Sequence, residues 1–293
     1  MIPLYQRQRF LLHPWAGVSI VLLAAGPFAA TVHAEDYTKS FSVANRANVH
    51  VDTNDGSVTV STGDTKQVEF RVEYRGYDLD KTLHIESHQQ GDEIELTARV
   101  VSKWQFSLGA LRRLHIEVRM PKDADLRVET GDGAVKANGL TGNIDLHTGD
   151  GSLTASSLMG VVRLHTGDGA IDATDLDGKC DALSGDGRIR LTGRFDVLRA
   201  KSGDGRIDVN ALHGSKLDSS WSISSGDGGI DVAVPSDLSA DIDATTHDGH
   251  ITSDIPITVE GVMSKSRVRG KMNGGGQTLT IRTGDGSIHL KQT

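Results

Sequence analysis

The chain has 293 residues, of which 34 are glycine, 4% are aromatic and one is cysteine. Its net charge of −8 argues against nucleic acid as the main partner, because phosphate binding requires clustered cations. The glycines lack a three-residue period, which excludes collagen, and a hydrophobic content of 37% argues against wholesale disorder.

The first 34 residues have the features of an export signal. Arg7 and Arg9 precede a short apolar run, and Val32-His33-Ala34 offers small residues at the −3 and −1 positions of a cleavage site after Ala34. The run is shorter than the roughly 20 residues of a membrane span. We therefore expect 1–34 to be a signal peptide, with an uncleaved anchor as the alternative. The mature chain would have no stable membrane span and would be periplasmic, extracellular or on the cell surface.

Residues 35–127 alternate between apolar and polar side chains, although irregularly. The alternation is clean at 68–74 and 114–120, which is typical of half-buried strands. No segment shows a helical period with caps. We expect this N-terminal β-rich region to cap one end of the repeats that follow and to hide their open strand edges.

A repeat dominates residues 128–293. Its mark is a Gly-Asp-Gly turn preceded by Thr or Ser, and the first five aspartates are each 18 residues apart. With three looser copies, the aspartates of these repeat turns are Asp132, Asp150, Asp168, Asp186, Asp204, Asp227, Asp248 and Asp285. A repeat of fixed length indicates stacked structural units.

Within each unit apolar residues alternate with polar ones, as at Val135 and Leu153, three residues after their aspartates. A period of two predicts two short strands per unit, broken at the Gly-Asp-Gly turn and again near Gly142, Gly160 and Gly178. Such a unit cannot bury its own apolar face, but stacking successive units at about 4.8 Å makes a continuous aliphatic core. The sequence therefore predicts an all-β fold, a β-solenoid of stacked 18-residue two-strand repeats with an irregular N-terminal β capping region.

The order of these features is an export signal, an alternating N-terminal part, the turn Met120-Pro121-Lys122-Asp123 and then the Gly-Asp-Gly repeats. It resembles the bacterial toast-rack family, β-strand-repeat domains of unknown function that are also called putative adhesins. The resemblance covers roughly residues 41–290, which would then be one continuous domain. It implies an envelope-associated interaction or scaffold module and supplies no catalytic residues.

The aspartate column is the first candidate for function. In stacked units its carboxylates would lie about 5 Å apart, where like charges repel by about 1 kcal/mol even in water. Calcium would offset this repulsion, but calcium-binding β-rolls use nine-residue repeats, with Asp two residues before the apolar position. Here Asp132 precedes Val135 by three. We therefore favour a turn in which Asp, helped by the preceding Thr or Ser, accepts backbone N–H bonds and Gly supplies a positive φ. We predict no cofactor, with calcium as the alternative.

A second column consists of Glu129, His147 and His165, which could ligate zinc on an outward face. The interpretation that we favour for it is a solvated polar face.

Other columns are easier to interpret. Asp145, Arg163, Asp181 and Arg199 alternate in charge and predict a cross-rung ladder that fixes register. Cys180 falls in an apolar column and is expected in the core. The basic stretch 265–271 is expected to be a surface loop, with an acidic partner as the alternative.

These observations predict an exported, non-catalytic, adhesin-like interaction or structural module of the bacterial cell envelope. Its repeated outward columns would suit an envelope protein or an extended glycan, a step that rests on analogy between folds. The alternatives are a carbohydrate-active β-helix enzyme and a calcium-stabilised β-roll binding module.

Overall fold

The computed structural model describes residues 35–101, 112–259 and 264–293. The predicted signal peptide, 1–34, lies outside the described residues. Every regular element within them is a strand, and they include no helix of the length and apolarity that a membrane crossing needs. The predicted all-β class is confirmed.

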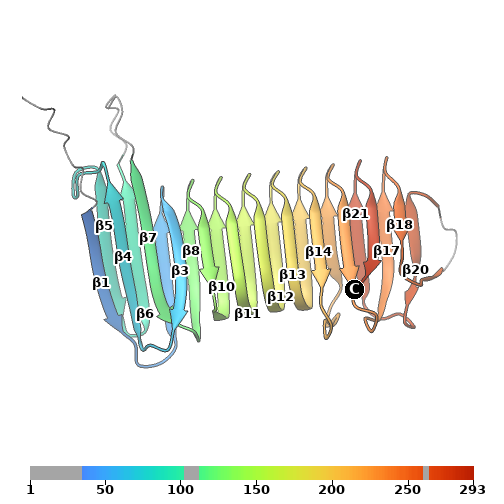
Figure 1. Ribbon diagram of the computed structural model, residues 1–293, viewed down its shortest axis with the longest axis horizontal. Helices are drawn as coiled ribbons and strands as arrows, with labels where there is room; N and C mark the ends of the chain where they lie inside the picture. The colour runs from blue at the N-terminus through green and yellow to red at the C-terminus, as the bar shows by residue number, and fades with distance from the viewer. Residues whose placement is uncertain (1–34, 102–111, 260–263) are drawn as a thin grey trace, which may run out of the picture. The chain divides into compact units, whose positions relative to one another are not determined.

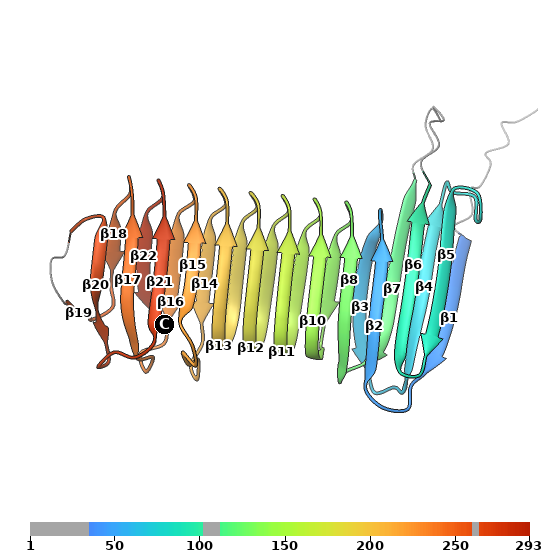
Figure 2. The ribbon, with the colours of Figure 1, turned by 180° about the vertical axis from the view of Figure 1, so that it is seen from behind.

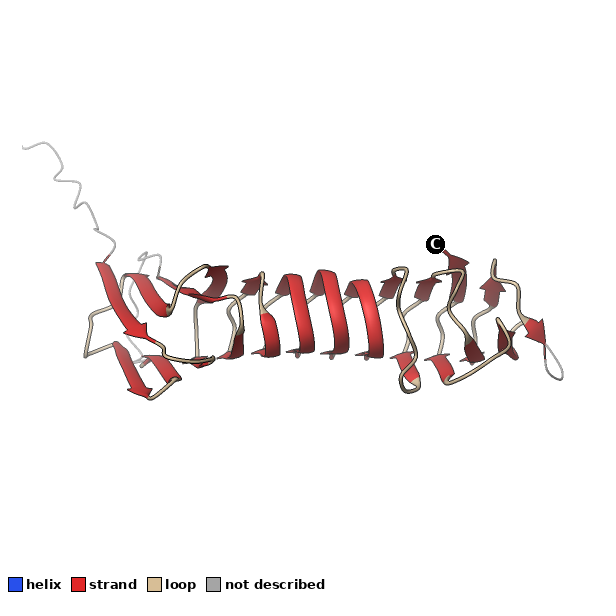
Figure 3. Ribbon diagram, turned by 90° about the horizontal axis from the view of Figure 1, so that it is seen from below, coloured by secondary structure: helices blue, strands red, loops and turns tan. Residues whose placement is uncertain are grey.

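The 22 described strands form one hydrogen-bonded sheet that is folded into two layers (Figures 1 and 3). The first layer holds the strands that lead into the repeat turns and, at its two ends, antiparallel strands that extend it. Its spatial order is β5 (Leu83–Gln90), β6 (Glu93–Val100), β2 (Ala47–Thr53), β8 (Ala124–Thr130), β10 (Thr141–Thr148), the second halves of β11 (Leu153–Thr166), β12 (Ile171–Ser184) and β13 (Ile189–Ser202), then β15 (Trp221–Ser225), β21 (Thr278–Thr283), β17 (Ala240–Thr246), β20 (Arg267–Met272) and β19 (Thr258–Val259).

The second layer holds the strands that leave the repeat turns and, at its N-terminal end, two antiparallel strands that extend it. Their spatial order is β1 (Glu35–Ser42), β4 (Gln67–Arg75), β7 (Arg113–Pro121), β3 (Ser57–Gly63), β9 (Val135–Asn138), the first halves of β11, β12 and β13, then β14 (Ile207–Ala211), β16 (Ile230–Val234), β22 (Ile288–Gln292) and β18 (Ile251–Ser253).

One rung consists of a first-layer strand, a turn and a second-layer strand, and neighbouring rungs are parallel and in register. β11 pairs with β12 from Leu153 opposite Ile171 to Thr166 opposite Ser184, an offset of one 18-residue repeat. The apolar columns point inward, where Leu153 and Ile171 are almost completely buried. The β-solenoid prediction is therefore confirmed.

The second predicted break within each unit is a bend in several rungs. β11 and β12 each continue for 14 residues, through Gly160 and Gly178. These glycines have φ values of 114° and 119°, which turn the chain from one layer to the other without ending the strand.

The rungs at both ends are stacked out of chain order. The last strands of the sequence, β21 and β22, lie between the β15–β16 rung and the β17–β18 rung (Figure 2). Similarly, β2 and β3 lie between β6 and β7 on one side and β8 and β9 on the other. Stacking in sequence order, as expected for successive units, is therefore wrong at these places. Each inserted strand has a partner on both edges, so neither edge is open to pairing with another chain.

Antiparallel strands cover the outer rungs. At the N-terminal end β5 pairs with β6, and β4 and β1 extend the second layer from β7. At the other end β20 covers β17. The basic stretch that was expected to be a surface loop is therefore largely strand, because Val268 and Met272 are buried in β20 while Arg269 pairs with Asp243.

The turn glycines are required by close contact between rungs, and not by a positive φ as expected. Within the repeats, none of the glycines that flank the aspartates has a positive φ. A Cβ atom on Gly169 would lie less than 3.0 Å from the carbonyl oxygen of Gly151 in the neighbouring rung, and Gly187 faces Gly169 in the same way. Only glycine lets the backbones of successive turns approach so closely.

We predict that Gly169→Ala lowers the free energy of unfolding by at least about 2 kcal/mol, because the added methyl group meets backbone that cannot move aside. Gly63→Ala is the matched control, since its Cβ would meet only the Arg119 side chain at 3.5 Å. Chemical denaturation of both variants measures the difference. Equal stabilities would contradict this explanation of the turn glycines.

Candidate functional site

The turns form one edge of the stack, the upper edge in Figures 1 and 2. Ten polar side chains are buried among the described residues, and nine of them are the Thr or Ser that precedes a turn. These nine are Thr53, Thr130, Thr148, Thr166, Ser184, Ser202, Ser225, Thr246 and Thr283. We call them the hydroxyl column.

Except for Thr53, whose hydroxyl bonds within its own turn, each hydroxyl donates to a carbonyl oxygen of a neighbouring turn. The Ser184 hydroxyl accepts the N–H of Gly187 at 2.9 Å and donates to the carbonyl oxygen of Gly169, one rung away, at 3.0 Å. The same two bonds are made by Thr148, Thr166, Ser202, Ser225 and Thr246. Backbone bonds run alongside, for example from the Gly167 N–H to the Gly149 carbonyl oxygen at 2.6 Å. Buried polar groups of the turn are thereby satisfied.

The eight repeat-turn aspartates stand outside this network. Their side chains are exposed, and within the described residues none of their carboxylates accepts a hydrogen bond or forms an ion pair. The expectation that Asp accepts backbone N–H bonds is therefore wrong for these turns, because the buried hydroxyl already takes that N–H. The eight form an acidic ridge, in the spatial order Asp132, Asp150, Asp168, Asp186, Asp204, Asp227, Asp285 and Asp248.

The three metal-ligating candidates lie in one row of the first layer. His147 is in register with Glu129 on one side and His165 on the other, and the two imidazole rings are 6.5 Å apart, edge to face. The Glu129 carboxylate is engaged by Arg127, whose Nε donates to Oε1 at 2.7 Å. This bond holds the pKa of Glu129 below its ordinary value, although burial opposes it. Across the described part of the chain, no three His, Cys, Asp or Glu side chains form a group that could hold a metal ion.

The predicted charge ladder is present on the outer face of the first layer. Asp145, Arg163, Asp181 and Arg199 occupy neighbouring positions on four successive rungs, and Arg127 on β8 extends the row by one. Arg199 Nη1 lies 4.0 Å from Asp181 Oδ2. We call these five residues the charge row.

Cys180 lies in the core, as expected. Its side chain is buried, and burial raises the pKa of the thiol to about 12. The thiol therefore stays protonated at neutral pH and is a poor nucleophile.

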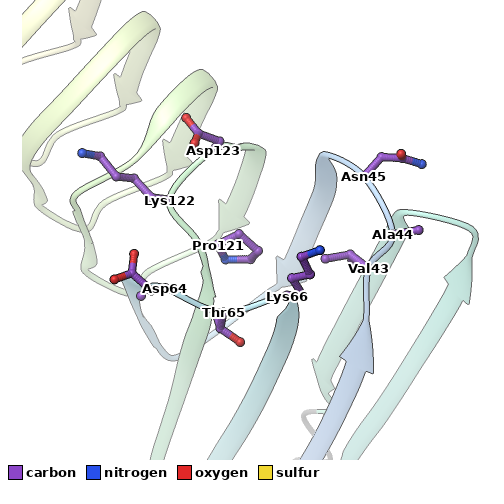
Figure 4. A pocket seen from close by; sticks show the side chains of 10 residues that line it. Val43, Ala44, Asn45, Asp64, Thr65, Lys66, Pro121, Lys122 and Asp123 are labelled. Atoms are coloured by element: carbon purple, nitrogen blue, oxygen red, sulfur yellow. The ribbon is translucent and has the colours of Figure 1, made fainter.

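A hollow of about 440 Å³ lies at the opposite edge, among the loops that follow β1, β3 and β7. Figure 4 shows Asp64 and Lys122 on one side of Pro121 and Val43 on the other. Its charges are mixed, since Lys66 and Lys122 accompany Asp64 and Asp123. It therefore has no clear preference for ligand charge.

The parallel, in-register rungs define a β-solenoid protein whose outward side chains form straight rows. The family model described as Toastrack DUF4097 matches residues 46–291, which is most of the chain. The protein belongs to this family, and the predicted resemblance is confirmed.

Solved structures of low sequence identity cover most of the chain. A putative adhesin from Bacteroides fragilis is 12% identical, with 88% of this chain and 97% of that chain covered and a TM-score of 0.44. A putative lipid binding protein from Parabacteroides distasonis is 12% identical, with coverages of 87% and 96% and a TM-score of 0.47. A putative cell adhesion protein from Clostridium sporogenes is 13% identical, with coverages of 89% and 100% and a TM-score of 0.33. No curated protein matches the chain.

We predict that Ser184→Ala lowers the free energy of unfolding by about 1–3 kcal/mol, because it leaves the Gly187 N–H and the Gly169 carbonyl without a partner. Ser184→Thr should retain wild-type stability, since Thr166 occupies this position in the rung on one side. Ser222→Ala, at an exposed position of β15 with no side-chain hydrogen bond within the described residues, is the control and should change stability by less than about 0.5 kcal/mol. Thermal or urea unfolding measures all three, and a neutral Ser184→Ala would contradict a structural role for the hydroxyl column.

Replacing Asp by Asn should change stability in opposite directions on the acidic ridge and at Asp243, which lies outside the ridge. Asp168→Asn should raise stability by up to about 1 kcal/mol at low salt, because it removes repulsion between neighbouring carboxylates. Asp243→Asn should lower it by about 1 kcal/mol, because Asp243 pairs with Arg269 at 3.2 Å and with Arg282 at 3.4 Å.

The contribution of Asp243 to stability depends on pH. Burial opposes ionisation of Asp243, but the hydrogen bond from Arg269 and the arginine charges around it hold the pKa of its carboxyl below the ordinary value. Its contribution is therefore present at neutral pH and is lost as the pH falls through that lowered pKa.

Melting with calcium or with a chelator should leave the wild-type transition unchanged. A calcium-dependent rise that Asp168→Asn abolishes would mean that the ridge binds the cation.

Proposed function

We propose that the protein is an exported, non-catalytic interaction module of the bacterial cell envelope, which binds an extended glycan or an envelope protein along its stacked rungs. The observation that carries the proposal is the charge row, in which five successive rungs present a charged side chain at the same outward position. Neighbouring rungs are spaced at about 4.8 Å.

Regular spacing favours an extended partner with its own repeat. A chain that lies along the row can make the same contact every second rung, since the sign of the charge alternates. Each exposed ion pair contributes little, with a median of about 0–1 kcal/mol. Several such contacts on one partner raise the total affinity because later contacts form at high effective concentration.

The first layer offers a better binding surface for an extended partner than the second layer does. Its row of Arg127, Asp145, Arg163, Asp181 and Arg199 has a charge on every rung. The equivalent row of the second layer, from Lys136 through Asp172, Arg190 and Asp208, is interrupted by the neutral Thr154.

Two observations support a non-catalytic role. The one cysteine is buried and protonated. The ridge carboxylates stand on an exposed edge, whereas glycosidases hold two carboxyl groups on either side of the bond they cleave.

The test expresses the full chain, confirms by mass spectrometry that the envelope-associated form begins at Glu35, and immobilises that form for retention of envelope glycans and proteins. We expect one species to be retained without turnover and released by salt. Neutralising the charge row with Arg163→Gln, Asp181→Asn and Arg199→Gln should abolish its retention. The matched control neutralises the second-layer row with Asp172→Asn, Arg190→Gln and Asp208→Asn and should retain it. Retention of every bound species by the charge-row variant, or product formation from polysaccharide, would contradict the proposal.

A further inference from the structure

A trough runs along the outer face of the second layer, where β3 lies between β7 and β9. The outward residues of β3 are short, namely Ser57, Thr59 and Ser61, and they form its floor. Longer side chains rise from the neighbouring strands, with His115 beside Ser57 and Lys136 beside Thr59. Two adjoining hollows of about 350 Å³ and 310 Å³ occupy the trough and share Thr59.

The larger hollow is polar and carries excess positive charge. Arg113 and Lys136 line it together with the hydroxyls of Ser57 and Thr59 and the imidazole of His115. Both cations are exposed, and neither forms an ion pair or a hydrogen bond with another described residue. In a chain of net charge −8, two uncompensated cations at one hollow are a local exception.

The single carboxylate of the larger hollow offsets only part of the charge of Arg113 and Lys136. Glu73 also lines it, but its carboxylate is paired with Arg71 at 3.0 Å. Glu117 lies at the adjoining hollow, where it is 4.0 Å from Arg71 and 3.7 Å from the His115 Nε2. The adjoining hollow is balanced in charge, because Arg71 and Arg119 line it together with Glu69 and Glu117. The larger hollow has two cations against one carboxylate, so an anion is drawn to it.

The floor is built to bond with hydroxyl or anionic oxygen atoms. Ser57 Oγ lies 2.8 Å from His115 Nδ1, which fixes the orientation of both groups. Thr59 and Ser57 are half-buried, so their hydroxyls remain accessible from the trough. An arginine fork and a lysine ammonium are the side chains that hold carboxylate and phosphate groups in proteins.

We propose that this trough binds an acidic sugar, with Arg113 and Lys136 holding its carboxylate or phosphate group and the floor hydroxyls bonding to its ring hydroxyls. A polyhydroxylated ligand fits because nearly all the lining side chains are polar, and because hollows of a few hundred Å³ accommodate small ligands. The continuation over Ser61 lets a second sugar unit follow. This site is on the opposite layer from the charge row, so either proposal can fail without the other.

Calorimetric titration of the chain that begins at Glu35 tests the site with three probes, an oligogalacturonate, glucose 6-phosphate and a neutral glucose oligosaccharide. We expect the acidic probes to bind and the neutral one not to bind, and the tighter of the two acidic probes identifies the anionic group. Arg113→Gln and Lys136→Gln should each weaken binding roughly tenfold. Lys201→Gln removes an exposed cation from the first layer and should leave binding unchanged.

Thermal melts of the three variants should match the wild type, because the substituted side chains make no ion pair within the described residues. A second readout, amide chemical shifts, should change on β3, β7 and β9. Failure of both acidic probes to bind, or an equal loss in Lys201→Gln, would overturn the proposal, the latter by showing that only overall charge matters.

Discussion

Successive turns touch through their backbones, and this contact sets how the rungs stack on one another. The glycine after each aspartate has no room for a side chain, because the carbonyl of the neighbouring turn occupies the space where a Cβ would lie. The buried hydroxyl of the same turn then ties the two together, accepting one N–H and donating to one carbonyl. A turn without this hydroxyl would leave both groups buried without a partner, which is unfavourable.

This contact fixes register, and register produces the surfaces. When turn stacks on turn, the strands on either side pair one repeat apart, so apolar residues such as Leu153 and Ile171 face inward together. The same register places Arg163 beside Asp181 on the outside. The inserted β21–β22 rung has the same register, since Ile288 pairs with Ile230 and with Ile251. Core, charge row and acidic ridge are therefore consequences of one contact.

The periodicity of the sequence was enough to predict the class of fold, the inward columns and the position of Cys180. It could not distinguish the residues that work inside the turn, because Asp168 and Thr166 recur with the same spacing while one is exposed and the other buried. Rung order depends on which strand edges would otherwise lack partners, and this is a property of the assembled sheet. The sequence does not reveal the trough, because Ser57, Arg113 and Lys136 come from strands distant in sequence, and only Lys136 belongs to a repeated column.

Hydrogen exchange of the turn amides shows whether the contact between turns holds the rungs together. The N–H groups of Gly151, Gly169, Gly187, Gly205 and Gly228 each donate to a buried hydroxyl. We expect them to exchange as slowly as the strand amides of Ile171 and Ile189, because turn and strand open only when rungs separate. Exchange of these glycines at the rate of the 212–220 loop, with the strands still protected, would contradict it.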